Sequence, residues 1–118
     1  MSFFAVWIDR ETAKLFQVSL EKMERQTIHF RYSDHHTHSL DELDRKQQER
    51  RFFSEVVEKL GPAENILILG PGVAKHHFQN FLIEHYPSLA RKVVGCETVD
   101  HPTDSQIAAM AKKALVRA

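Results

Sequence analysis

Histidines are the side chains of this sequence whose type and spacing most readily suggest chemistry. Eight of the 118 residues are His, and three of them fall within Asp34-His35-His36-Thr37-His38. Imidazoles suit zinc, copper or nickel, and the aspartate can complete a ligand set, with His76, His77 and His101 as further candidates. The segment is also typical of a solvated loop. Because metal sites usually draw their ligands from several elements, we assign it no metal.

A second group of candidate residues is cationic. It comprises Arg45, Lys46, Arg50 and Arg51, with Arg31 upstream. Such a cluster can bind the phosphate backbone of a nucleic acid, although 16 basic and 16 acidic residues cancel over the whole chain. No aromatic residue is interleaved with these cations, which argues against base stacking on single strands. The alternative interpretation is a charged helix exterior balanced by neighbouring glutamates.

The turn Gly70-Pro71-Gly72, followed by Lys75, is a candidate anion site. Glycines let backbone N–H groups approach a ligand, and a helix N-terminus offers unpaired N–H groups with partial positive charge. Lys75 adds a full charge, so Gly70, Gly72 and Lys75 together suit a phosphate. The spacing differs from the Walker pattern, and a tight turn between a strand and a helix explains the same residues without a ligand.

Asp9, at the end of the first apolar run, suggests metal-dependent hydrolysis. Nucleases with a ribonuclease H-like fold bring several carboxylates together around two divalent cations. The later carboxylates Glu97, Asp100 and Asp104 show no informative spacing, and a polar hairpin turn accounts for Asp9 equally well. Cys96 is the only cysteine and lies in an apolar stretch, and no Cys-His spacing supports nucleophilic catalysis. We therefore assign no catalytic residue and no cofactor.

Three β-like stretches precede these candidates and must position them. They cover residues 3–9, 13–20 and 23–32, and the short polar turns between them predict an antiparallel meander. Apolar residues then recur at helical spacing up to a Gly-Pro pair, which predicts an amphipathic helix over residues 41–60. Residues 32–40, between the meander and this helix, are polar and rich in His, so we expect a flexible loop there.

The second half of the chain alternates strands and helices. Residues 66–69 form a continuous apolar run, as in a strand covered on both faces. Helical spacing follows, with a kink or an early end expected at Pro87, and a strand is predicted over residues 93–98. Thr103 and Gln106 have capping-box spacing before a closing helix. The order β-β-β-α-β-α-β-α predicts an α/β domain with a mixed sheet in a ribonuclease H-like arrangement.

Length and composition indicate one globular domain. A chain of 118 residues, 42% hydrophobic and 27% charged, is long enough for a single core, so we predict one domain over residues 1–118. The apolar run near the N-terminus is too short for a signal peptide or a membrane span. We therefore expect a cytoplasmic protein without a membrane partner.

The junction between the apolar run and the following helix carries a family resemblance. The predicted element order and the stretch from Ile66 to Phe78, which reads ILILGPGVAKHHF, are similar to the central domain of Pelota and the archaeal and eukaryotic peptide-release factors. In Pelota this junction reads apolar strand, small residue, Pro-Gly, two residues, Lys, then Phe. The resemblance extends loosely over most of the chain. It implies the release-factor central-domain fold and a stand-alone bacterial protein of the translational machinery.

The resemblance also identifies the loop that would carry the function. In release factors this loop holds Gly-Gly-Gln, which promotes hydrolysis of peptidyl-tRNA, whereas the matching segment here, Tyr32 to Arg45, lacks the triplet. His35, His36 and His38 occupy its place. Peptide release is therefore not implied, and Pelota, which also lacks the triplet, acts on stalled ribosomes. The flanking decoding and partner-binding domains have no counterpart in the sequence, so codon recognition is not carried over.

These observations predict a non-catalytic, translation-associated module that binds the ribosome or RNA, either ribosomal or transfer RNA. The residues predicted to bind RNA or another anion are Arg31, His35, His36, His38, Arg45, Lys46, Arg50, Arg51, Gly70, Gly72 and Lys75. One alternative is a divalent-metal-dependent phosphodiesterase or nuclease that uses Asp9. Another is a homo-oligomeric interaction module that pairs through the exposed edge of the meander.

Overall fold

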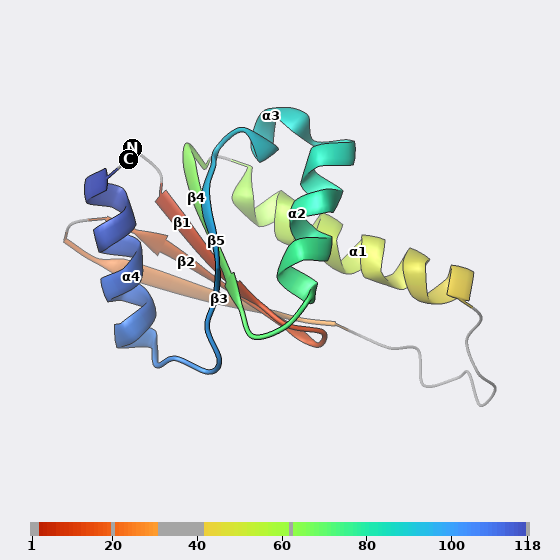
Figure 1. The fold of residues 1–118 in the computed structure, drawn as a ribbon, viewed down its shortest axis with the longest axis horizontal. Helices are drawn as coiled ribbons and strands as arrows, with labels where there is room; N and C mark the ends of the chain where they lie inside the picture. The colour runs from red at the N-terminus through yellow and green to blue at the C-terminus, as the bar shows by residue number, and fades with distance from the viewer. Residues whose placement is uncertain (1–2, 20, 31–41, 62, 118) are drawn as a thin grey trace.

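A computed structural model describes residues 3–19, 21–30, 42–61 and 63–117 of the chain (Figure 1). The elements in chain order are β1 (Phe3–Ile8), β2 (Thr12–Val18), β3 (Met23–His29), α1 (Glu42–Leu60), β4 (Asn65–Gly70), α2 (Ala74–His85), α3 (Pro87–Ala90), β5 (Val93–Thr98) and α4 (Asp104–Arg117). The predicted order of strands and helices is confirmed, with the short helix α3 in addition. No helix within the described ranges is long and apolar enough to cross a membrane.

The five strands form one mixed sheet in the order β3-β2-β1-β4-β5. β1 and β3 are both antiparallel to β2, which gives the predicted meander. On its other side β1 is parallel to β4, so that Ala5 pairs with Phe16 across one edge and with Leu67 across the other. β5 continues the sheet parallel to β4. The α/β class and the mixed sheet are thus confirmed.

Helices cover both faces of this sheet (Figure 1). The helices α1, α2 and α3 lie on one face and α4 lies on the other. All six residues of β1 are buried, and they alternate between the two cores. Phe4, Val6 and Ile8 pack toward α1 and α2, whereas Phe3, Ala5 and Trp7 pack toward α4. The full burial follows from the position of β1 at the centre of the sheet.

The apolar run of β4 is covered on both faces, as predicted. Ile66 and Ile68 belong to the core under α1 and α2, and Leu67 and Leu69 belong to the core under α4. The run stops at Gly70, where the chain leaves the sheet toward α2.

The predicted capping box at the start of α4 is confirmed by two reciprocal hydrogen bonds. The backbone N–H of Thr103 donates to Oε1 of Gln106 over 2.8 Å, and the N–H of Gln106 donates to Oγ1 of Thr103 over 3.1 Å. These bonds satisfy N–H groups that have no partner within the helix. They cap the N-terminus of α4, in which Ile107 and Ala111 are buried against the sheet.

Two element boundaries depend on local chemistry. α2 ends at His85, and Pro87, which lacks an N–H, begins α3, so the predicted early end at this proline is confirmed. β3 ends at His29, earlier than predicted, although Phe30 still packs against the core under α1 and its N–H donates to the carbonyl of Glu11. Tyr32, the predicted last residue of this strand, lies outside the described residues.

Candidate nucleic-acid interface

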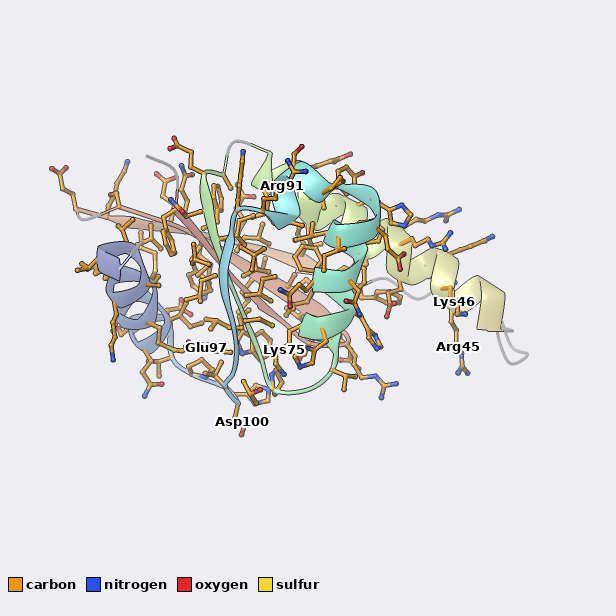
Figure 2. The ribbon with its side chains drawn as sticks, turned by 45° about the horizontal axis from the view of Figure 1, so that its top comes forward. Arg45, Lys46, Lys75, Arg91, Glu97 and Asp100 are labelled. Atoms are coloured by element: carbon orange, nitrogen blue, oxygen red, sulfur yellow. The ribbon has the colours of Figure 1, made fainter. Side chains whose placement is uncertain are left out.

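The N-terminal half of α1 presents the cationic residues that the sequence singled out. Among the side chains of α1 that the structure describes, from Arg45 onward, the buried ones begin at Phe52, because only the C-terminal half of the helix lies over the sheet. The earlier turns extend beyond it, and all four cations there are exposed: Arg45, Lys46, Arg50 and Arg51. Figure 2 shows Arg45 and Lys46 at this projecting end, away from the sheet.

The four cations do not share one side of the helix. At about 100° per residue, Arg45, Lys46 and Arg50 fall within one half of the circumference. Arg51 lies about 100° beyond Arg50, so the four side chains together span about 240° of the circumference. We name the first three the α1 patch. The sequence grouped all four because they are close along the chain, whereas a single flat or grooved ligand can meet only three of them at once.

Contacts with α2 hold the projecting helix in place. Phe53 packs edge-on against Phe78, with ring centroids 5.4 Å apart, and at the same centroid distance against Phe81. Beyond these rings, Nδ1 of His77 lies 3.7 Å from a carboxylate oxygen of Glu49. Glu49 stands between the cations of the α1 patch, and this contact turns its carboxylate toward α2.

The remaining residues predicted to bind RNA have no place in this geometry. Arg31, His35, His36 and His38 lie outside the described residues, so their part in an RNA-binding surface stays a prediction.

Gly70 meets a geometric requirement that is independent of any ligand. A Cβ atom at this position would lie 2.3 Å from the carbonyl oxygen of Ile8, which belongs to the neighbouring strand β1. Only a residue without Cβ allows this close approach of two backbones. A Cβ at Gly72 would meet nothing within 4 Å. The two glycines of the turn therefore differ in their physical role.

Lys75 is turned inward to the same turn. Its side chain is 3% exposed, and its ammonium donates a hydrogen bond to the carbonyl oxygen of Gly72. A buried ammonium needs such a partner, because desolvation of an unpaired charge is costly. In this geometry the ammonium of Lys75 stabilises the turn by its hydrogen bond to Gly72 and is not directed toward a ligand. Figure 2 shows Lys75 well separated from Arg45 and Lys46.

An open pocket of about 640 Å³ lies between this turn and the β1–β2 hairpin. Its lining residues are Asp9, Arg10, Glu11, Pro71, Gly72, Val73 and Ala74. Asp9 is engaged as the cap of the hairpin, since its Oδ1 accepts hydrogen bonds from the N–H groups of Glu11, over 2.9 Å, and Thr12, over 2.7 Å. Within the described ranges, no three His, Cys, Asp or Glu side chains come together as a metal site. The geometry thus favours the hairpin interpretation of Asp9 over the nuclease interpretation.

A contact that the sequence did not suggest joins β5 to α2. Sγ of Cys96 lies 4.0 Å from Nδ1 of His76. Burial raises the pKa of the Cys96 thiol above its ordinary value, and the nearby charge of Lys75 opposes this only in part. The thiol is therefore protonated at neutral pH, which does not suit a nucleophile. Twenty residues separate Cys96 from His76 in the chain, and no local spacing signals the pair.

Comparison with known proteins gives partial sequence matches. No family model matches the sequence. The chain is 45% identical over 62 residues to the Protein pelota homolog of Pyrococcus furiosus, a match that covers 48% of this chain and 17% of that protein. It is 30% identical over 91 residues to the Protein pelota homolog of Methanocaldococcus jannaschii, covering 75% of this chain and 25% of that protein. The match thus spans a quarter or less of the length of each of these relatives.

Solved structures share the fold along nearly the whole chain. Archaeoglobus fulgidus Pelota superposes with a TM-score of 0.68 at 22% identity, over 98% of this chain and 32% of that one. An archaeal translation termination factor superposes with a TM-score of 0.64 at 14% identity, over 98% and 39% of the two chains. The predicted release-factor central-domain fold is therefore confirmed. These relatives are archaeal and give no support to the expectation of a stand-alone bacterial protein.

Proposed function

We propose that this chain, whose similarities support membership of the Pelota and release-factor family, is a cytoplasmic translation-associated module that contacts ribosomal or transfer RNA without catalysing peptide release. The observation that carries the proposal is the α1 patch, three exposed cations on one side of a helix that projects from a domain of this family. One of the solved relatives is a translation termination factor.

The electrostatics of the α1 patch suit a phosphate backbone. Binding of polyanionic RNA releases condensed counterions for each phosphate that a cation neutralises, so a small patch suffices for measurable affinity at low salt. The chain as a whole carries no net charge at neutral pH. Attraction to RNA is therefore local to the patch and to the adjoining loop, and we expect it to weaken steeply as salt is raised.

The sequence argues against peptide release by the chemistry of the release factors. Its four glycines are Gly61, Gly70, Gly72 and Gly95, so no two are adjacent and no Gly-Gly-Gln triplet exists. The proposed role is accordingly binding, in which the α1 patch and the His-containing segment before it contact the RNA. Lys75 and its turn lie apart from this surface (Figure 2).

Ribosome co-sedimentation with a triple substitution tests the proposal. In the variant Arg45→Gln, Lys46→Gln, Arg50→Gln, we expect weaker binding to ribosomes and to purified RNA. The slope of log affinity against log salt should fall by about 2 to 3, since each lost phosphate contact contributes roughly 0.7 to 0.9.

A matched control removes the same charge elsewhere on the surface. Arg91, Lys92 and Lys112 are also exposed cations, and Arg91 lies away from the α1 patch in Figure 2. Their joint replacement by Gln should leave the salt slope almost unchanged. Equal loss of binding in both variants would show that net charge alone is responsible, and absence of ribosome or RNA binding by the unmodified chain at low salt would refute the proposal.

A further inference from the structure

The strand β5 offers an open edge with little charge. β5 ends the sheet and pairs there with β4, so in the described part of the chain its outer edge has no neighbouring strand. Its first four residues, Val93 to Cys96, carry no charge, and the side chain of Val94 is 43% exposed. Exposed edges of this kind are available for pairing with another strand.

The opposite edge of the sheet differs in a way that discourages pairing. β3 carries Glu24 and Arg25, and Arg25 reaches across to α4, where its Nη1 lies 2.7 Å from Oδ2 of Asp104. Charged side chains on an edge strand are a common protection against association. β5 is therefore the better candidate for contact with another chain, in contrast to the meander edge that the sequence suggested.

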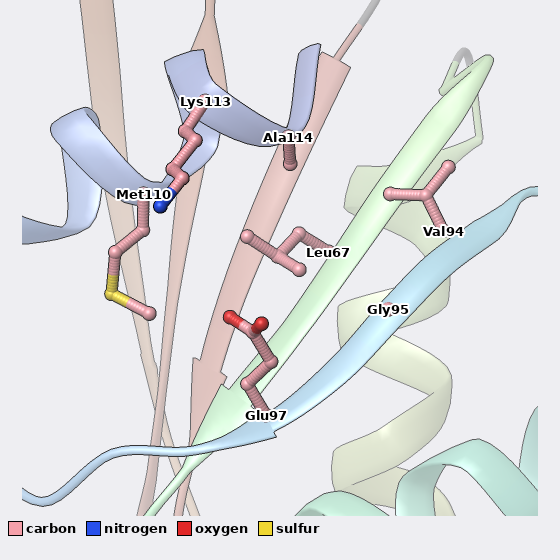
Figure 3. A pocket seen from close by; sticks show the side chains of 7 residues that line it. All are labelled: Leu67, Val94, Gly95, Glu97, Met110, Lys113 and Ala114. Carbon is pink, nitrogen blue, oxygen red and sulfur yellow. The ribbon is translucent and has the colours of Figure 1, made fainter. Parts of the chain in front are cut away.

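A groove lies beside β5 on the face covered by α4 (Figure 3). α4 buries Ile107 and Ala111 against the core formed by β1, β2 and β4 and leaves a space of about 310 Å³ between itself and β5. The residues that line it are Leu67, Val94, Gly95, Glu97, Met110, Lys113 and Ala114. Gly95 has no side chain, and a Cβ there would lie 3.2 Å from a methyl group of Leu67. The glycine thus keeps the groove open at the strand.

The two charged residues of the groove have opposite signs. Glu97 extends from β5 and Lys113 from α4, and Figure 3 shows both side chains at the groove. The register of β5 with β4 pairs Gly95 with Leu67 and Glu97 with Leu69, so positions 95 and 97 both face α4. A surface that carries one anion and one cation beside an open strand can be complementary to itself.

We propose that β5 and this groove form a self-association surface that binds a second copy of the chain. The two β5 strands pair antiparallel about a twofold axis at Cys96. Glu97 of each copy then lies opposite Gly95 of the other, on the same face of the joined sheet, because directly opposed residues in an antiparallel pair point to the same side.

In this arrangement the groove of each copy is filled by a side chain of the other copy. The absent side chain at Gly95 leaves room for Glu97 of the second copy, and Lys113 at the groove supplies the matching charge. Both contacts occur twice, as an isologous interface requires. Figure 1 shows α1 and α4 on opposite faces of the sheet, so the groove and the proposed RNA-binding surface belong to different faces.

Single charge reversals test the proposed pairing by sedimentation equilibrium at physiological salt. We expect the unmodified chain to form dimers as its concentration rises. Glu97→Lys and Lys113→Glu should each weaken the dimer about tenfold or more, because like charges then oppose each other twice. Both side chains are exposed, so the variants should keep the unfolding temperature of the unmodified chain.

Mixing the two singly reversed chains distinguishes contact between copies from contact within one copy. In the mixture, the reversed charge at position 97 of one chain meets the reversed charge at position 113 of the other, and the heterodimer should regain the original affinity. The control mixture of Glu58→Lys with Lys112→Glu has the same net charges away from the groove and should show no gain over its components. A chain that stays monomeric at every concentration, or dimers that persist in both reversed variants, would overturn the proposal.

Discussion

Replacement of Gly70 by Ala should destabilise the domain strongly. The added Cβ would lie 2.3 Å from the carbonyl oxygen of Ile8, far inside the 3.4 Å at which ordinary van der Waals contact begins. The atom that it meets belongs to the backbone of β1, which is held on both sides by β2 and β4 and cannot move as a side chain can. Overpacking of this kind costs about 1–3 kcal/mol, and we expect about 3 kcal/mol because backbone must shift.

A loss of this size is a large share of a stability that totals about 5–15 kcal/mol in small domains. For a chain of 118 residues it corresponds to a melting temperature lower by about 12 °C. The only tryptophan, Trp7, is 3% exposed and lies in β1, so its fluorescence reports unfolding in urea or on heating.

Gly72→Ala is the matched control in the same turn. A Cβ there meets nothing within 4 Å, and no glycine in the described ranges has a positive φ, so this substitution should change stability by less than about 1 kcal/mol. Unfolding of both variants at the same urea concentration would refute the prediction. It would show that the close approach between Gly70 and Ile8 does not require a glycine.

Two further predictions concern Cys96 and the start of α4. Alkylation of Cys96 should be slow at neutral pH and accelerate as pH rises beyond the ordinary range of a thiol, because burial raises its pKa. Lys75→Met removes the charge that lowers this pKa, so alkylation at a fixed pH should slow further; a faster reaction in the folded variant contradicts the assignment. Thr103→Ala removes one bond of the capping box and should cost about 1 kcal/mol in urea denaturation, whereas Thr103→Ser should be close to neutral. An unchanged midpoint in Thr103→Ala would show that the cap does not stabilise α4.

The sequence predicted the features that depend on local periodicity. The continuous apolar run at residues 66–69 indicated a strand with two covered faces, and β4 has both. The spacing between Thr103 and Gln106 indicated a capping box, and both of its hydrogen bonds form. Pro87 indicated the end of a helix because proline lacks the backbone N–H that a helix interior needs, whatever its tertiary surroundings.

Features that depend on distant parts of the chain could not be predicted in this way. Gly70 looked like part of an anion site, but its requirement for glycine comes from Ile8 in another strand. The burial of Lys75 depends on how α2 docks, which a charge in the first turn of a helix does not reveal. The groove beside Gly95 exists because α4 packs over β1, β2 and β4 and leaves β5 uncovered. The position of α4 relative to β5 cannot be predicted from the sequence of either element alone.

The candidate site shows the same division. Their closeness in the sequence identified the cations of α1, but only helical geometry shows that the four do not share one side of the helix. Sequence order alone could not show that α1 extends beyond the sheet, because that depends on the length of helix that the core covers.

The central position of β1 has a consequence for how this chain folds as it is synthesised. Its pairing with β2 is local and can form early. Its other edge pairs with β4, so Phe3 has no partner on that side until Asn65 has been synthesised. Until β4 is made, the apolar segment FFAVWI keeps one row of backbone groups open, and such a segment readily joins a like strand from another nascent chain. We therefore expect the docking of β4 to close this open edge and to lower the risk of aggregation during synthesis.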